Sequence, residues 1–81
     1  MSRVLLFGRL RDLAGWRERM VEPSPRTLAE LRARLARDDK ALGEALAHPS
    51  VRIAVNQQIV TGEAVLSETS EIAFMPPMSG G

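Results

Sequence analysis

The middle of the chain carries one strongly patterned helix, PSPRTLAELRARLAR over residues 23–37. Thr27 stands three residues before Glu30, the spacing of a capping box, in which side chain and backbone satisfy each other's hydrogen-bonding groups. Ser24, followed by proline, offers an alternative start for the same helix. One face is apolar and must pack on another element, because leucines recur there at helical spacing, at Leu28, Leu31 and Leu35.

Before this helix, the sequence predicts a β-hairpin. Residues 3–10, RVLLFGRL, form a short apolar run typical of a strand that is buried on both faces. Residues 11–15, RDLAG, supply a turn that ends in glycine, and residues 16–22, WRERMVE, are interpreted as the half-exposed partner strand.

After the helix, the pattern favours one weaker helix and then strands. Residues 38–48 predict a short helix capped by an aspartate, and it ends where a histidine precedes a proline. Residues 50–56 alternate as a strand does, and after a tight turn residues 59–60 begin a short return strand. A loop over residues 61–70 leads to the last strand, EIAFM, at residues 71–75.

A hairpin, a helix and further strands in this order predict an α+β fold of the ubiquitin-like β-grasp type. We expect a mixed sheet of four to five strands with one main helix packed across it. The apolar continuity of residues 4–7 and 72–74 suits two parallel strands side by side at the sheet centre. The expected domain covers residues 1–75, and residues 76–81 form an extended, flexible C-terminal tail.

Composition excludes several classes of function. The 81 residues suit a single domain with a small core. The formal net charge of +1 gives no indication of a basic surface that would bind nucleic acid. The chain has no cysteine and one histidine, His48, so neither a thiolate nor a zinc site is expected. We find no membrane-spanning run and no signal-peptide pattern, which predicts a cytoplasmic protein without a membrane partner.

The chain ends in FMPPMSGG, a stretch without any charged side chain. Met75 and Pro76 each precede a proline and are therefore biased to extended backbone. In polyproline geometry, residues 76–81 could reach on the order of 18 Å from the sheet. Gly80 and Gly81 have no Cβ, so the last backbone units could pass through a narrow channel in another protein.

The group that would arrive in such a channel is the terminal carboxylate. Its pKa of about 3.5 keeps it ionised at neutral pH, which makes it a poor electrophile. Chemistry at this carboxylate would therefore need activation, most simply as a mixed anhydride with AMP. The alternative is an inert tail, because a terminal Ser-Gly-Gly is also a common frayed chain end.

The segments VLLFGRLRDLAG, TLAELRARL, AVNQQIV and EIAFMPPMSGG together resemble the MoaD family. These are the ubiquitin-like sulfur carriers that form the small subunit of molybdopterin synthase. The resemblance covers nearly the whole chain, and its most specific motif is the F-x-P-P-x-S/T-G-G ending.

This resemblance implies a sulfur carrier that binds no cofactor itself and is not an enzyme by itself. An adenylating enzyme similar to ubiquitin-activating enzymes would use ATP to adenylate Gly81, and a sulfurtransferase or other sulfur donor would convert it to a thiocarboxylate. The sulfur would pass to cyclic pyranopterin monophosphate to form the molybdopterin dithiolene. The catalytic residues would lie in the large subunit, with which two carriers would form a heterotetramer.

Residue by residue, the resemblance implies that Gly81 is the adenylate and thiocarboxylate site. The partner-binding residues it implies are Gly80, Ser79, Met78, Pro77, Pro76, Phe74 and Arg11. Phe7 is expected in the core and Trp16 as a partly buried hairpin residue. Two alternatives share the fold and the Gly-Gly end: a sulfur carrier of the thiamin pathway, and a ubiquitin-like protein modifier that forms isopeptide bonds through Gly81.

Overall fold

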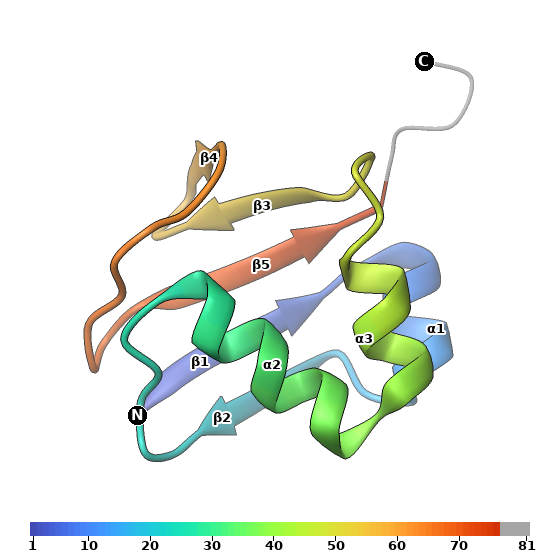
Figure 1. The fold of residues 1–81 in the computed structure, drawn as a ribbon, viewed down its shortest axis with the longest axis horizontal. Coiled ribbons are helices and arrows are strands. Elements are labelled where there is room, and N and C mark those ends of the chain that lie inside the picture. Colours follow the sequence, from blue (N-terminus) through green and yellow to red (C-terminus); the bar gives the residue numbers. More distant parts are fainter. Residues whose placement is uncertain (77–81) are drawn as a thin grey trace.

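A computed structural model of the chain describes residues 1–76, and the structural statements below concern these residues. Five strands form one sheet in the order β2-β1-β5-β3-β4, accompanied by three helices (Figure 1). The elements in chain order are β1 (Ser2–Leu6), α1 (Gly8–Ala14), β2 (Glu18–Val21), α2 (Leu28–Asp38), α3 (Lys40–Leu46), β3 (Arg52–Val55), β4 (Gln58–Val60) and β5 (Glu71–Met75).

The first and last strands lie side by side at the sheet centre and run parallel, as the sequence predicts. Val4 is opposite Ile72 and Leu6 is opposite Phe74 in their register. β2 pairs with β1, β3 with β5 and β4 with β3, all antiparallel. The sheet is therefore mixed, and the β-grasp prediction is confirmed.

The helices α2 and α3 cover one face of the sheet (Figure 1). Strand residues two apart share a face, so alternate side chains of the central strands point toward these helices. The apolar stripe of α2 packs on these inward side chains. The other face of the sheet has no helix over it within the described chain. The core residues are Val4, Leu6, Leu10, Val21, Leu28, Leu31, Leu35, Leu42, Leu46, Ile53, Leu66, Ile72 and Phe74.

The start of α2 follows the predicted capping box. The Thr27 hydroxyl accepts a hydrogen bond from the backbone N–H of Glu30 at 3.2 Å. The Glu30 carboxylate reaches back to the backbone N–H of Arg26, one residue before the cap. The alternative start at Ser24 is therefore wrong. Asp39 caps α3 in the same way, accepting from the N–H of Leu42 at 3.1 Å.

The prediction was wrong between the first two strands, where α1 replaces the end of a long strand and a simple turn. Gly8 has φ of +56°, a left-handed conformation that ends β1 and lets the chain turn into a helix. Leu10 then points inward and is buried in the core. Gly15 closes the helix with φ of +83° and its N–H donates to the carbonyl of Arg11. The fold accordingly has three helices: the predicted main helix α2, the weaker helix predicted over residues 38–48, which is α3, and the unpredicted α1.

The tight turn between β3 and β4 is confirmed. Asn56 and Gln57 both have positive φ, 51° and 68°, as two-residue hairpins of the I′ type require. The Asn56 side chain also accepts from the N–H of Glu71 at 2.9 Å, which ties this turn to the start of β5.

Candidate functional site

The end of β5 and the junction between β1 and α1 meet where the chain leaves the sheet. The N–H of Phe7 donates to the carbonyl of Phe74 at 3.2 Å. A Cβ added to Gly8 would lie only 2.8 Å from Cγ of Pro76. Gly8 therefore leaves the space in which the Pro76 ring sits, and the two residues together define where the C-terminal segment begins.

Phe74, expected at a partner interface, lies in the core instead. Its side chain is 0% exposed, and its neighbours in register are Leu6 of β1 and Ile53 of β3. All three point to the face that the helices cover. The aromatic ring therefore has no surface to offer a partner, and its contribution to this region is to anchor β5.

Phe7, expected in the core, is on the surface with 46% of its area exposed. The reason is the two-residue period of β1, in which Val4 and Leu6 point into the core. Phe7 follows Leu6 and therefore takes the opposite face. The predicted strand over residues 3–10 is right only as far as Leu6, where β1 ends, and the expectation of an inward Phe7 was wrong.

Apolar side chains gather on the sheet face that no helix covers. The register places Leu5, Ala73, Ala54 and Ile59 in one row across four strands. Ile59 is 55% exposed at the end of this row. Together with two neighbours near the tail, this row forms what we term the open-face patch: Leu5, Phe7, Ala54, Ile59, Ala73 and Met75.

Charged groups border the open-face patch along β1 and its neighbours. Arg3 forms ion pairs with Glu71 of β5 and with Glu18 of β2, the latter at 3.5 Å. The hydrogen bond that Arg3 donates to the Glu71 carboxylate, together with the negative charge of that carboxylate, raises the pKa of the Arg3 guanidinium. Arg52 lies opposite Met75 in the register. An apolar centre with a charged border is the usual composition of a protein-binding surface.

Arg11, the other predicted partner contact in the described chain, lies in α1 and not in a turn. Its Nε is 3.7 Å from a carboxylate oxygen of Asp12, and both side chains are largely exposed. An exposed pair of this kind contributes little to stability, so the guanidinium is free to bind elsewhere. The remaining predicted residues lie outside the described residues: Pro77, Met78, Ser79, Gly80 and Gly81.

No group of three or more His, Cys, Asp or Glu side chains in residues 1–76 could hold a metal ion. Trp16 is half-buried against the core, as expected, and the guanidinium carbon of Arg19 lies 4.4 Å from its ring centre. Within the same residues, no helix has the length and apolarity needed to cross a membrane. The site that the described chain offers is thus a surface and a tail base.

Comparison with known protein families shows the family to which this chain belongs. The model of the ThiS family matches residues 4–81. The chain belongs to the ThiS family. Two curated relatives of this ThiS-family chain are molybdopterin synthase sulfur carrier subunits. The protein of Escherichia coli is 33% identical over 81 residues, and that of Haemophilus influenzae is 32% identical. Both alignments cover the whole of each chain, and they confirm the resemblance read from the motifs.

Solved structures with the same fold include two kinds of protein. The small archaeal modifier protein 1 of Methanosarcina acetivorans superposes with a TM-score of 0.82 at 25% identity, covering 99% of this chain and 95% of that one. The complex of subunits 1 and 2 of the molybdopterin-converting factor from Helicobacter pylori contains a chain with a TM-score of 0.71 at 23% identity. That alignment covers 99% of this chain and 97% of the other.

Proposed function

We propose that this protein is the sulfur-carrier subunit of a molybdopterin synthase. The observation that carries the proposal is the full-length match to curated relatives with that role, together with the Gly-Gly end of this chain. The fold supports it physically, because β5 is held between β1 and β3 and delivers the C-terminal segment from the sheet centre.

The proposed chemistry takes place on the carboxyl group of Gly81. An adenylating enzyme joins this carboxylate to the α-phosphorus of ATP and releases pyrophosphate, which converts a poor electrophile into an acyl adenylate. A sulfur donor supplies a sulfide equivalent that displaces AMP and leaves a thiocarboxylate. The thiocarboxylate sulfur then bonds to the pterin substrate in the large subunit, which supplies the catalytic residues, and water cleaves the acyl C–S bond and returns Gly81 to a carboxylate. This chain itself binds no cofactor in the scheme.

The open-face patch is the proposed docking surface for the large subunit. It is continuous with the tail base, because Phe7 and Met75 lie beside Pro76 and Gly8. The pairing of subunits 1 and 2 in the Helicobacter pylori complex supports a partner of this kind. In the proposal, Arg11 of helix α1 adds a polar contact at the edge of the same interface.

The tail residues act beyond this surface in the proposal. Pro76, Pro77, Met78 and Ser79 enter the partner, and Gly80 allows a close approach of backbone to the reacting group. Because these side chains carry no charge, little desolvation free energy opposes their insertion.

The experiment that tests the proposal is co-expression with the adenylating enzyme and sulfur source of the same host, followed by intact mass measurement. We expect a mass gain equal to the replacement of one oxygen by sulfur, mapped to Gly81. A variant lacking Gly81 should show no such gain and should melt at the same temperature. An unmodified wild-type mass alongside active partners would overturn the proposal.

A second candidate function is a ubiquitin-like protein modifier. It is favoured by the similarity to small archaeal modifier protein 1. The adenylate is common to both functions, and the difference lies in the acceptor. Adducts of high molecular weight in cell extract that require Gly81 would favour the modifier, whereas sulfur transfer to the pterin substrate would favour the carrier. Transfer of sulfur to a thiazole synthase instead would indicate the thiamin pathway.

A further inference from the structure

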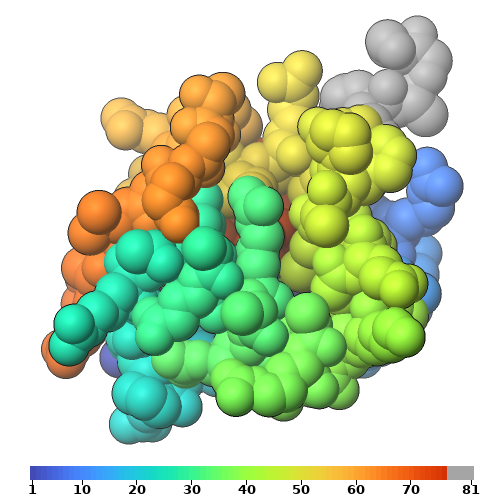
Figure 2. Space-filling model, in the orientation of Figure 1, coloured from blue at the N-terminus to red at the C-terminus, as the bar shows by residue number. Residues whose placement is uncertain are grey.

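A groove with a volume of about 560 Å³ opens between α2, the end of α3 and the β3–β4 hairpin. Figure 2 shows the hollow between the orange segment that follows β4 and the yellow segment that joins α3 to β3. We term it the α3–β3 groove. Its lining residues are Arg32, Leu46, Ala47, His48, Pro49, Ser50, Val51, Arg52, Ile53, Ile59, Val60, Thr61 and Gly62.

The lining of this groove is electropositive. Arg32 is the cation on the helix-covered side, because the two-residue period of β3 sends the Arg52 side chain toward the open face, and none of the lining residues in the described chain is acidic. The Thr61 hydroxyl adds hydrogen-bonding capacity, whereas the Ser50 hydroxyl is already engaged with Nδ1 of His48 at 2.5 Å, and the remaining walls are largely apolar. Low-polarity walls strengthen the field of the cations inside a cleft.

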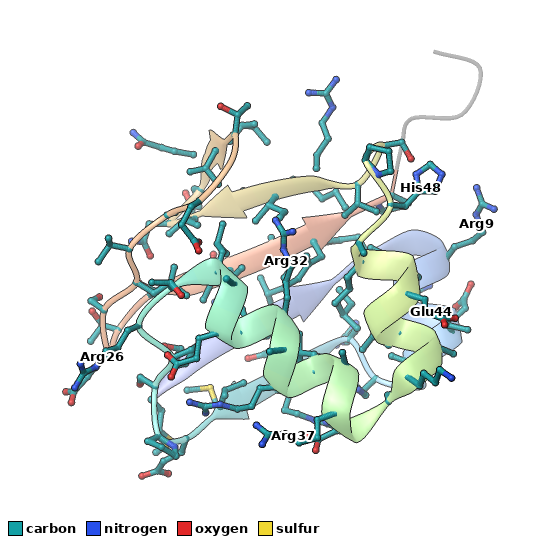
Figure 3. All side chains as sticks on the ribbon, viewed as in Figure 1. Arg9, Arg26, Arg32, Arg37, Glu44 and His48 are labelled. Carbon is teal, nitrogen blue, oxygen red and sulfur yellow. The ribbon has the colours of Figure 1, made fainter. Side chains whose placement is uncertain are left out.

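Arg32 is the residue that α2 contributes to the lining of the groove. Its side chain leaves α2 and extends over the sheet toward β3 (Figure 3). Its Nε is buried and has no hydrogen-bond acceptor within residues 1–76. A buried donor without an acceptor is costly and uncommon in folded proteins. The planar guanidinium fork matches the oxygens of a carboxylate or a phosphate.

The Glu63 carboxyl senses the charge of Arg32, but it is already engaged with other groups. Its carboxylate accepts from the N–H of Ala64 at 2.9 Å and from that of Ala29 at 3.2 Å. These backbone groups, Ala64 foremost, lower the pKa of the Glu63 carboxyl, and the charge of Arg32 contributes least. No ion pair joins Glu63 to Arg32 in the described chain.

From these observations we propose that the α3–β3 groove binds an oxyanion. The Nε–H and terminal N–H groups of Arg32 would donate to it, and the Thr61 hydroxyl lies along the same walls. The proposal is independent of the sulfur-carrier function, because it rests on the groove and not on the tail. The oxyanion can be a phosphate group of a small molecule or a carboxylate presented by another protein, and the test below separates the two.

The test is an NMR titration of the ¹⁵N-labelled full-length protein, followed at backbone amides and at arginine Nε–Hε signals. Sodium phosphate and sodium acetate are titrated separately, with sodium chloride keeping the ionic strength constant. We expect saturable shifts at groove amides such as those of Val51, Thr61 and Gly62, and at one Nε–Hε signal that is missing from Arg32→Gln. Saturation by phosphate alone indicates a phosphate ligand, and equal saturation by acetate indicates a carboxylate.

The matched variants are Arg32→Gln and Arg37→Gln, which remove the same charge from the same helix. Arg37 is exposed and does not line the groove. We expect Arg32→Gln to weaken binding by about tenfold or more, as for a lost charge-assisted hydrogen bond, and Arg37→Gln to leave it unchanged. Equal effects of the two variants, or shifts that rise linearly without saturating, would overturn the proposal. Should Arg32→Gln fail to fold, Thr61→Val must weaken binding for the proposal to stand.

Discussion

Gly8→Ala tests whether the β1–α1 junction sets the path of the C-terminal segment. The added Cβ would lie 2.8 Å from Cγ of Pro76, whereas carbon atoms in contact sit at about 3.5–4.0 Å. Pro76 must therefore move by roughly 0.7 Å or more, or β1 must shift by the same amount. Independently, an alanine at φ of +56° carries backbone strain of about 1–2 kcal/mol.

The two effects can be separated because the chain offers matched controls. Gly15 and Gly62 also have positive φ, 83° and 76°, and an added Cβ meets no atom within 4 Å at either position. Gly15→Ala and Gly62→Ala should therefore lower stability by the same strain of about 1–2 kcal/mol while leaving Pro76 in place. Gly8→Ala alone should also displace the base of the tail.

The assay is the rate of sulfur transfer from the loaded carrier to the pterin substrate in the presence of the large subunit, with thermal denaturation measured in parallel. Because displacements of about 1 Å can cost a reaction up to about 100-fold, we expect Gly8→Ala to lose about tenfold in rate. The controls should lose little. Pro76→Ala removes the Cγ that is too close and should restore part of the rate in the double variant. Equal rates for Gly8→Ala and Gly15→Ala would refute the reasoning.

Three further predictions concern stability and docking. Gly43→Ala should destabilise by about 1–3 kcal/mol, measured by denaturant unfolding, because its Cβ would lie 2.4 Å from Cβ of Ala36; unchanged stability would contradict the close packing of α2 on α3. Phe74→Ala should lower the free energy of unfolding by about 3–5 kcal/mol, whereas Phe7→Ala should mainly weaken binding of the large subunit, with titration calorimetry and melting as the two readouts. The Glu63 carboxyl has a lower pKa in the folded protein than in the unfolded chain, so its ionised form stabilises the fold. This contribution to the free energy of unfolding is fully present above the unfolded pKa of about 4.3, and it is lost as the pH falls through the lower folded pKa. Glu63→Gln should flatten the acid limb of stability against pH, and an unchanged limb would argue against this role.

The sequence predicted those elements whose signals are local. Thr27 and Glu30 define the start of α2 through their own spacing, and the two central strands follow from short apolar runs. The helix α1 was missed, because the end of β1 depends on the conformation of Gly8, which packs on a proline at the other end of the chain. A contact between residues so far apart in the sequence cannot be predicted from a local sequence pattern.

The exchange of roles between the two phenylalanines has a related cause. A strand that is apolar on both faces gives no sign of which face the helices cover. The register between β1 and β5 settles it, since Leu6 and Phe74 are opposite one another and both point inward. Phe7 must then lie on the open face. The α3–β3 groove could likewise not be predicted from the sequence, because Arg32 is one of several arginines on an amphipathic helix.

The position of β5 explains how so small a domain can direct a chain end. Met75 is held by pairing with β3, and Phe74 by its buried ring and by the N–H of Phe7. Pro76 has no N–H and therefore cannot extend the hydrogen-bond ladder, so the sheet ends at a defined residue. Gly8 leaves room for the Pro76 ring at the point where the chain leaves the sheet, which we call the exit. The domain thus fixes the starting point of its C-terminal segment through core packing, and substitutions that keep the core but alter this exit should separate stability from carrier function.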